Sequence, residues 1–268
     1  MSSPIIPGAE PVSVTNGSRG GVLLLHGYMG TVQTIRDWAM AFARADFSVE
    51  APLLPGHGTS VEDMLNTQWS DYVRCAEEAH SKLLERHRNI IVGGICTGSM
   101  LAAFVVVNHP ETTTGMISVN GFFKLPKHWN FGFMEEMAST NRRFFPWFRG
   151  RSIEDPNSPA LITYEQAPLA PILSMKPANY EIWPRLKEIR CPILAFSSLR
   201  DTVVPPKDPN TNAWLAEVSG PVEQVLLERS NHVATMDYDK GIIEARSVLW
   251  AEALMDKIHT HTSEGVAW

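Results

Sequence analysis

Residues 89–99 read NIIVGGICTGS, and this junction constrains the fold more than any other stretch of the chain. The apolar run 89–95 is typical of a buried strand, and the run that follows, SMLAAFVVVNH (99–109), is typical of a buried helix. Between them, Gly94 and Gly98 flank Cys96 at the spacing of a very tight turn. Such a turn strains the backbone of its middle residue, and the glycines remove side chains that would clash. The junction therefore predicts a strand–turn–helix unit with Cys96 at its tip.

The same order of strand and helix recurs along the chain. Short apolar runs predict strands at 21–27, 48–58 (ending in a Pro/Gly turn), 89–95, 114–121, 191–198 and 223–229. Apolar residues at helical spacing predict helices at 34–45, 68–88, 99–109 and 241–258. Strands that alternate with helices form a mainly parallel sheet flanked by helices on both faces. We therefore expect the α/β class, for which 268 residues suit one layered fold.

One long segment, residues 122–188, interrupts this alternation and shows no clear strand. Its first part holds nine of the chain's 24 aromatic residues: Phe122, Phe123, Trp129, Phe131, Phe133, Phe144, Phe145, Trp147 and Phe148. Two interpretations are compatible: an extra helical layer with its own small core, and a cap over a site that receives an apolar group. We expect a core of residues 1–121 and 189–268, with a helical, aromatic-rich cap (122–188) inserted before the penultimate strand.

Composition and charge narrow the possible partners. The net charge is −6 and no dense basic cluster is present, which argues against nucleic acid. No apolar run reaches the roughly 20 residues of a membrane span, and the N-terminal stretch lacks the features of a secretory signal. Three widely spaced cysteines fit neither a disulfide framework nor a zinc site. We expect a cytoplasmic protein without metal or cofactor, and the oligomeric state stays open.

Cys96 has two interpretations. Cysteine is among the residues most often fully buried, so Cys96 could be a structural thiol. The predicted turn, however, places it at the carboxyl edge of the sheet and at a helix N-terminus, where the positive end of the helix dipole favours a thiolate. The Gly94-x-Cys96-x-Gly98 spacing is that of a nucleophile elbow, in the strand–turn–helix context that this motif requires. The context favours a nucleophile.

A nucleophile needs a base, and the base needs a group that orients it. His232, in LLERSNHVATMD, follows the last predicted strand, and Asp201, in AFSSLRDTVVPP, follows the penultimate one. Either residue alone could be an ordinary loop residue. Three such residues, each placed just after a strand, predict a catalytic triad of Cys96, Asp201 and His232.

Acyl transfer also needs backbone donors for the developing oxyanion. The stretch LLLHGYMGT predicts a strand that ends in His26-Gly27-Tyr28, so the amide of Tyr28 is one candidate donor. The amide of Thr97, next to the nucleophile, is the other. The stretch PGHG (55–58) is interpreted as a structural turn near the site.

These motifs together resemble the bacterial carboxylesterase and monoacylglycerol lipase branch of the α/β-hydrolase superfamily. The resemblance rests on VLLLHGYMGT, APLLPGHGTS, GICTGS, RDTVVPP and ERSNHVATMDYD, runs from about residue 20 to 258 and is weakest in the cap. It implies an α/β-hydrolase fold, with Cys96, Asp201 and His232 as the triad and Tyr28 and Thr97 as oxyanion donors. Members of this branch hydrolyse esters without a cofactor, through a covalent acyl-enzyme.

The chain departs from this family at two positions. It has Cys96 where the family has serine, and Ser99 where glycine is common. A cysteine elbow is similar to that of dienelactone hydrolases and of polyhydroxyalkanoate synthases and depolymerases. We expect hydrolysis of an ester or thioester of an apolar acyl group through a thioester on Cys96. The alternatives are acyl transfer or acyl polymerisation from that thioester, a serine esterase whose serine has been replaced by cysteine, and a non-catalytic protein that binds a ligand.

Overall fold

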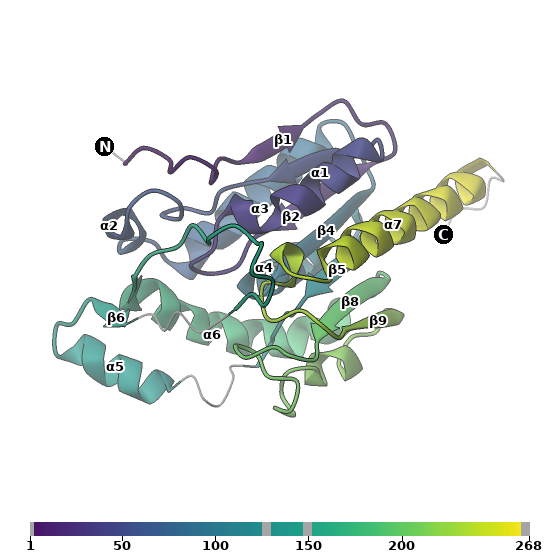
Figure 1. Ribbon diagram of the computed structural model, residues 1–268. Coiled ribbons are helices and arrows are strands. Elements are labelled where there is room, and N and C mark those ends of the chain that lie inside the picture. Colours follow the sequence, from purple (N-terminus) through teal and green to yellow (C-terminus); the bar gives the residue numbers. More distant parts are fainter. Residues whose placement is uncertain (1–2, 125–129, 147–151, 264–268) are drawn as a thin grey trace.

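The computed structural model describes residues 3–124, 130–146 and 152–263 of the chain. Seven strands form one sheet in the order β1-β3-β2-β4-β5-β8-β9 (Figure 1). They are β1 (Val12–Val14), β2 (Gly21–Leu25), β3 (Ser48–Ala51), β4 (Ile90–Ile95), β5 (Thr113–Val119), β8 (Ile193–Ser198) and β9 (Val222–Leu227). All neighbouring strands are parallel except β1, which pairs antiparallel with β3 at one edge.

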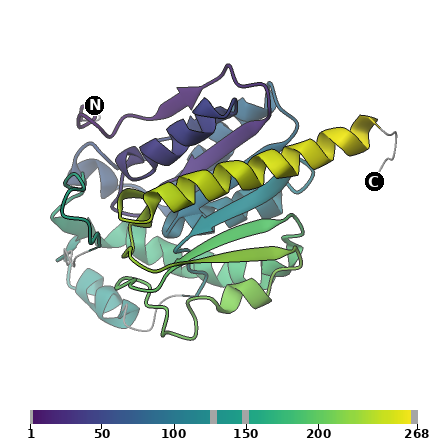
Figure 2. The ribbon, with the colours of Figure 1, turned by 45° about the vertical axis from the view of Figure 1, so that its right-hand side comes forward.

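Helices cover both faces of this sheet, as the alternating pattern predicts. Helices α1 (Arg36–Arg44) and α7 (Lys240–Ser263) pack together on one face, and α3 (Trp69–Leu84) and α4 (Thr97–Asn108) pack on the other (Figures 1 and 2). The remaining α-helices are α2 (Val61–Met64), α5 (Phe131–Ser139) and α6 (Leu169–Arg185), and short 3-10 turns lie at Val32–Ile35, Leu186–Glu188, Ala213–Ala216 and Ala234–Met236. No helix in the described ranges is long and apolar enough to cross a membrane.

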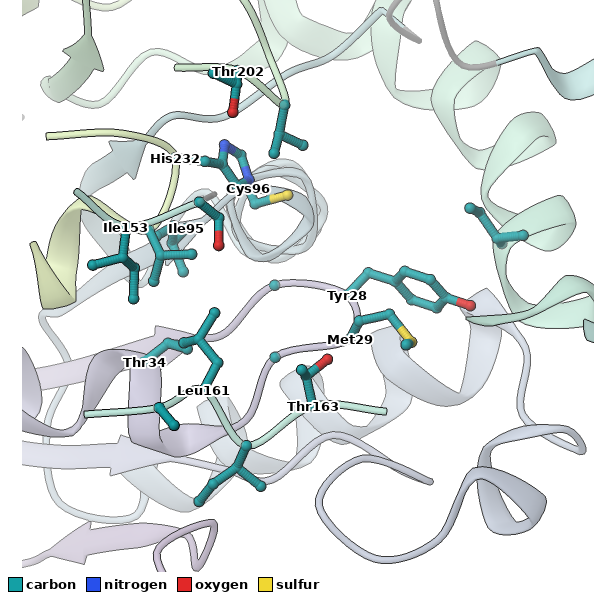
Figure 3. A pocket seen from close by; sticks show the side chains of 18 of the residues that line it. Tyr28, Met29, Thr34, Ile95, Cys96, Ile153, Leu161, Thr163, Thr202 and His232 are labelled. Carbon is teal, nitrogen blue, oxygen red and sulfur yellow. The ribbon is translucent and has the colours of Figure 1, made fainter. Parts of the chain in front are cut away.

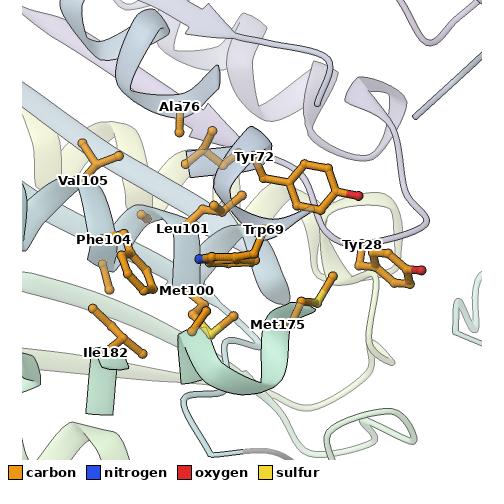
Figure 4. Packing of buried hydrophobic residues seen from close by; sticks show 14 of the residues in the cluster. Tyr28, Trp69, Tyr72, Ala76, Met100, Leu101, Phe104, Val105, Met175 and Ile182 are labelled. Carbon is orange, nitrogen blue, oxygen red and sulfur yellow. The ribbon is translucent and has the colours of Figure 1, made fainter. Parts of the chain in front are cut away.

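The core explains why the central elements have such apolar sequences. Every residue of β2 and β4 is buried, because helices cover both sides of these strands. Helix α4 is buried from Thr97 to Val107, since it lies between the sheet and helices α3 and α6. Figure 4 shows this packing, in which large side chains from the three helices interdigitate: Trp69, Tyr72, Met100, Phe104 and Met175.

Two parts of the fold differ from the expectation. The sequence does not predict β1, because three residues are too few to show an alternation. The segment 122–188 is not purely helical: β6 (Phe144–Pro146) and β7 (Gln166–Pro168) form a small antiparallel sheet between α5 and α6. Both strands end in proline, which in a sequence indicates a turn or a break rather than a strand.

Candidate active site

The structure places Cys96 at a sharp turn between β4 and α4. Its backbone has φ 57° and ψ −123°, a left-handed conformation that costs free energy in any residue other than glycine. A Cβ on Gly94 would lie 2.3 Å from the carbonyl carbon of Gly98, and a Cβ on Gly98 would lie 2.1 Å from the oxygen of Leu25. Both glycines are therefore required by close backbone approach, as the motif predicts.

Ser99, the second departure from the family pattern, has a local role. Its hydroxyl is fully buried and donates a 2.8 Å hydrogen bond to the carbonyl oxygen of Gly94, across the turn. Gly121 faces this side chain, since a Cβ on Gly121 would lie 2.6 Å from the Cβ of Ser99. Ser99 thus ties the start of α4 to the end of β4 and braces the turn that carries Cys96.

Asp201 and His232 meet beside this turn. Asp201 follows β8 and His232 follows β9, and both side chains are buried. The Nδ1 atom of His232 lies 2.8 Å from Oδ2 of Asp201. The other oxygen of Asp201 accepts hydrogen bonds from the backbone amides of Val203 and Val204, at 2.8 and 2.7 Å. The carboxylate is therefore fixed in a geometry that keeps the proton of His232 on Nδ1 and directs Nε2 away from Asp201.

The charge of His232 follows from its neighbours. Burial alone lowers its pKa, but the charge of Asp201 and that of Cys96, together with hydrogen bonds to both, raise this pKa well above its usual value of 6.5. Figure 3 shows the imidazole beside Cys96, with Thr202 nearby. An imidazolium so placed can stabilise a thiolate and later donate a proton to a leaving group.

The loop that carries His232 is held by buried amide side chains that the sequence analysis does not identify. Asn231 accepts hydrogen bonds from the amides of Thr202 and His232, at 3.0 and 2.8 Å. Asn120, which directly follows β5, donates to the carbonyl oxygen of His232 at 2.8 Å. Asn120 lies at a strand end, as the residues of the predicted triad do, and this position is the one signal that the sequence offers for it.

Asp237, like Asn231 and Asn120, acts as a clamp between loops. It fixes the segment 152–163, which we call the strap. The carboxylate of Asp237 accepts hydrogen bonds from the amides of Glu154, Asp155 and Asn231, at 2.8, 2.9 and 2.8 Å. The amide of Val233 donates to the carbonyl oxygen of Ser152 at 2.9 Å. The strap and the loop that carries His232 are therefore held as one unit.

The loop after β2 approaches the turn from the other side. His26 is fully buried; its Nε2 accepts from the amide of Leu54 at 3.1 Å, so Nδ1 carries the proton and donates to the oxygen of Gly27 at 3.0 Å. The next amide, that of Tyr28, donates to the hydroxyl of Thr97 at 2.5 Å. Both predicted oxyanion donors thus belong to residues in contact beside Cys96, and their role stays a prediction. His57, in the PGHG turn, is buried against His26 with ring centroids 5.0 Å apart.

Cys96 and His232 line a cavity of about 800 Å³. The apolar part of its wall includes Met29, Ile95, Phe133, Met134, Phe145, Ile153, Leu161, Ile172 and Val203. Polar side chains also line it, several of them from the strap: Ser152, Asp155, Ser158, Thr163 and Thr202. Figure 3 shows Tyr28 and Met29, Leu161 and Thr163, and Ile153 arranged around the cavity.

The aromatic residues of the cap region fall into separate groups. Phe133 and Phe145 line the cavity, as a cap would require. Phe122 and Phe123 instead belong to the buried core, where Phe123 lies against Trp214 with ring centroids 4.6 Å apart. Phe131 is buried within α5, and Phe144 is half-buried. The expected cap residues Trp129, Trp147 and Phe148 lie outside the described residues.

Within the described ranges, no three histidine, cysteine, aspartate or glutamate side chains converge as a metal site would require. Beside Cys96 lies the imidazole of His232, whose Nδ1 is held by the buried carboxylate of Asp201. This set suits nucleophilic attack on a carbonyl carbon.

The sheet, the sharp turn and the order of Cys96, Asp201 and His232 define the class of the protein: it is an α/β hydrolase. The chain belongs to the hydrolase family described as serine aminopeptidase, S33, whose model matches residues 16–239. The fold class and the superfamily predicted from the sequence are thereby confirmed. The roles of the individual site residues, Cys96 above all, stay predictions.

Two relatives share substantial sequence with the chain. It is 33% identical over 249 residues to the thermostable monoacylglycerol lipase of Bacillus sp. (strain H-257), over 91% of this chain and 95% of the relative. A solved structure described as one of two metagenome-derived lipolytic enzymes, LipS and LipT, matches with a TM-score of 0.86 and 29% identity, over 93% of this chain and all of the other. The monoacylglycerol lipase of Paleococcus ferrophilus matches with a TM-score of 0.67 and 16% identity, over 91% and 98%, which supports the fold alone.

Proposed function

We propose that this α/β hydrolase cleaves carboxylic esters of apolar acyl groups through a covalent thioester on Cys96. The chain is a carboxylic ester hydrolase, like the lipase and lipolytic enzymes that it matches over most of its length. The observation that carries the finer proposal is the geometry at the turn. Cys96 opens into an apolar cavity, His232 lies beside its sulfur, and Asp201 holds Nδ1 of that imidazole at 2.8 Å.

The proposed reaction has two halves. The sulfur of Cys96, as thiolate, attacks the ester carbonyl carbon, and the carbonyl π electrons move to oxygen. When the carbonyl re-forms, the alcohol leaves and takes the proton from Nε2 of His232. The neutral His232 then removes a proton from water, which attacks the thioester; the acid leaves, and the thiolate and imidazolium are restored. The amides of Tyr28 and Thr97 are the proposed donors to the oxyanion in both halves.

The residues that line the cavity suit a substrate ester that has an apolar acyl chain and a polar alcohol. Its wall combines apolar side chains, such as Phe133 and Phe145, with hydroxyl and carboxylate groups of the strap, such as Ser152 and Asp155. The relative from Bacillus is a monoacylglycerol lipase, and a monoacylglycerol has this combination of parts. In this proposal residues 122–188 act as the cap that encloses the acyl chain, with Phe133 and Phe145 in contact with it.

The direct test is the intact mass of the protein after brief exposure to a panel of acyl esters, including monoacylglycerols. We expect an added acyl group on Cys96, with longer acyl chains accepted better than acetyl. The variant Cys96→Ala should form no adduct and show no turnover while it still binds substrate. Turnover by that variant would contradict the nucleophile assignment.

The variant Cys96→Ser tests whether the site is adapted to sulfur. Serine is smaller and depends on His232 to remove its proton during attack, so a site built for cysteine should lose activity with serine. A serine variant much faster than the parent would instead identify the chain as a serine esterase that carries an introduced cysteine.

Acyl transfer is the second candidate, because the sulfur at position 96 would form a thioester intermediate. Thioesters react more readily with amines and thiols than oxyesters do. Product analysis in the presence of alcohol, amine and thiol acceptors separates the two functions. Transfer that outcompetes water would favour the acyltransferase, and free acid as the dominant product would favour the hydrolase.

A further inference from the structure

Thr97 directly follows the proposed nucleophile, and its buried side chain contacts the loop after β2. The side chain belongs to the first turn of α4, and the residue is only 2% exposed. Its hydroxyl oxygen accepts a hydrogen bond from the backbone amide of Tyr28 at 2.5 Å. That amide is one of the two proposed oxyanion donors. The Thr97 hydroxyl therefore lies within hydrogen-bond distance of one proposed oxyanion donor, on the residue that follows Cys96.

The hydroxyl proton of Thr97 is not used within the protein. A threonine hydroxyl can donate one hydrogen bond and accept two. Among residues 3–124, 130–146 and 152–263, its hydrogen bond is the one in which it accepts from Tyr28, and no acceptor faces its own proton. Buried donors are normally paired, and an unpaired one beside a reactive group indicates an acceptor that arrives with the substrate.

We propose that the hydroxyl of Thr97 is a catalytic hydrogen-bond donor to the substrate's carbonyl oxygen, a third donor beside the amides of Tyr28 and Thr97. This inference rests on the proposed ester hydrolysis. As the sulfur of Cys96 bonds to the carbonyl carbon, the π electrons move to oxygen, and the Thr97 hydroxyl donates to that oxygen without losing its proton. The Tyr28 amide has a single hydrogen, which points to the Thr97 hydroxyl in the resting site and is shared between that hydroxyl and the substrate oxygen once the ester is bound. When the carbonyl re-forms and the alcohol leaves, the hydroxyl returns to its resting state.

The proposal predicts opposite effects for two small substitutions. Thr97→Val keeps the shape of the side chain and removes the hydroxyl, so the rate of Cys96 acylation should fall by about 10²–10³, the usual effect of losing one oxyanion donor. Thr97→Ser restores a hydroxyl and should recover most of that loss. If the hydroxyl were only a resting partner for Tyr28, Thr97→Val would free that amide, and the rate would stay equal or rise. An equal or faster rate overturns the proposal.

A second reaction of the same sulfur separates a catalytic role from a structural one. Alkylation of Cys96 by iodoacetamide needs the thiolate but develops no oxyanion. Thr97→Val should therefore be alkylated at the parent rate while its acylation by esters is slow. Parallel loss of both reactions would mean that the substitution disturbs the turn itself and would overturn the catalytic role.

Two controls complete the experiment. Thr113→Val removes another buried hydroxyl, at the start of β5 and outside the cavity wall, and should leave acylation and alkylation unchanged. Thermal unfolding of each variant establishes that it is folded. If the parent protein is alkylated at Cys96 but acylated by no ester, the proposed function fails, and the role of Thr97 fails with it. If the parent and Thr97→Val are acylated equally fast, only the role of Thr97 fails.

Discussion

The cysteines differ in what surrounds each sulfur atom. Burial raises the pKa of Cys75 to about 11 and that of Cys191 to about 12, so both remain thiols at neutral pH. Cys96 instead lies beside the imidazole of His232, whose pKa stays well above 6.5 because Asp201 and Cys96 outweigh the effect of burial. The thiolate is the reactive form of cysteine.

We therefore expect iodoacetamide at neutral pH to label Cys96 at least about tenfold faster than Cys75 or Cys191. Turnover should fall in proportion to the label on Cys96, and a bound substrate analogue should slow labelling. Peptide mapping by mass spectrometry gives the three rates. Full activity in protein labelled at Cys96 would contradict its role as nucleophile.

Asp201 allows a test in which a single atom changes. In Asp201→Asn the amide oxygen can still accept from Val203 and Val204, so the fold should be retained. The amide nitrogen would then face Nδ1 of His232 as a donor, and the imidazole would place its proton on Nε2, toward Cys96. Turnover of a chromogenic ester should fall by about 10⁴ with little change in melting temperature. Turnover near that of the parent would exclude Asp201 from the triad.

At the scale of elements, α5 and β6 each bring a side chain of the proposed cap to the cavity, Phe133 and Phe145. If Phe133 and Phe145 contact the acyl chain, catalytic efficiency should rise by up to about fourfold per added methylene, equivalent to about 0.8 kcal/mol. Phe133→Ala and Phe145→Ala should weaken long-chain esters more than acetate esters. Tyr180→Ala, on the exposed side of α6 at 67% exposure, is the control and should affect neither. A flat chain-length profile in the parent would limit the cap to a structural role.

Asp237 joins the strap to the loop that carries His232 by accepting hydrogen bonds from backbone amides of both. Its substitution therefore tests how much this connection contributes to the free energy of unfolding. Asp237→Asn replaces one acceptor oxygen with a donor and removes the charge from four hydrogen bonds. Each hydrogen bond to a charged group contributes about 1.5–3 kcal/mol, so unfolding in urea should show a loss of at least about 3 kcal/mol. Asp256→Asn, a surface partner of Arg19 with a side chain 69% exposed, should change stability by less than about 1 kcal/mol. Similar stability for both variants would contradict the clamp.

The elements that the sequence predicts well are those whose burial is uniform or periodic. β2 and β4 are buried at every position, and α3 buries one face. The sequence therefore shows a continuous apolar run for each of these strands and an apolar stripe at helical spacing for α3. β1, β6 and β7 are three residues each and owe their pairing to neighbours distant in sequence. No local pattern of that length distinguishes a strand from a turn.

At the scale of the whole molecule, the proposed triad can be predicted from the sequence because parallel strands end at one edge of the sheet. Cys96, Asp201 and His232 each follow a strand, so their order along the chain already implies proximity. The clamps are different. Asn120, Asn231 and Asp237 bind backbone groups of distant segments, and a backbone group has no sequence signature. The positions of these clamps follow only from the assembled fold.

Two neutral histidines near the site make the whole fold sensitive to acid. Burial, with a smaller effect of His57, lowers the pKa of His26 to about 3. Burial lowers the pKa of His57 to about 4. His57 donates from Nδ1 to the oxygen of Pro55 at 3.1 Å, and its ring lies against Tyr72 with centroids 5.4 Å apart. Protonation of either ring would place an unbalanced charge in the core.

The sign of the effect follows from proton binding. Between pH 6.5 and about 4 the unfolded chain binds a proton at His57 that the folded chain does not, so the free energy of unfolding decreases as the pH is lowered, by up to about 1.4 kcal/mol per pH unit. His232 has the opposite shift, and its contribution to stability, complete below pH 6.5, adds no slope in this window. His57→Phe keeps a ring against Tyr72 without a titrating group. Urea unfolding at about pH 6.5 and about pH 5 should give a difference about 2 kcal/mol smaller in this variant than in the parent. An unchanged difference would mean that His57 titrates normally and is not the buried neutral group of this fold.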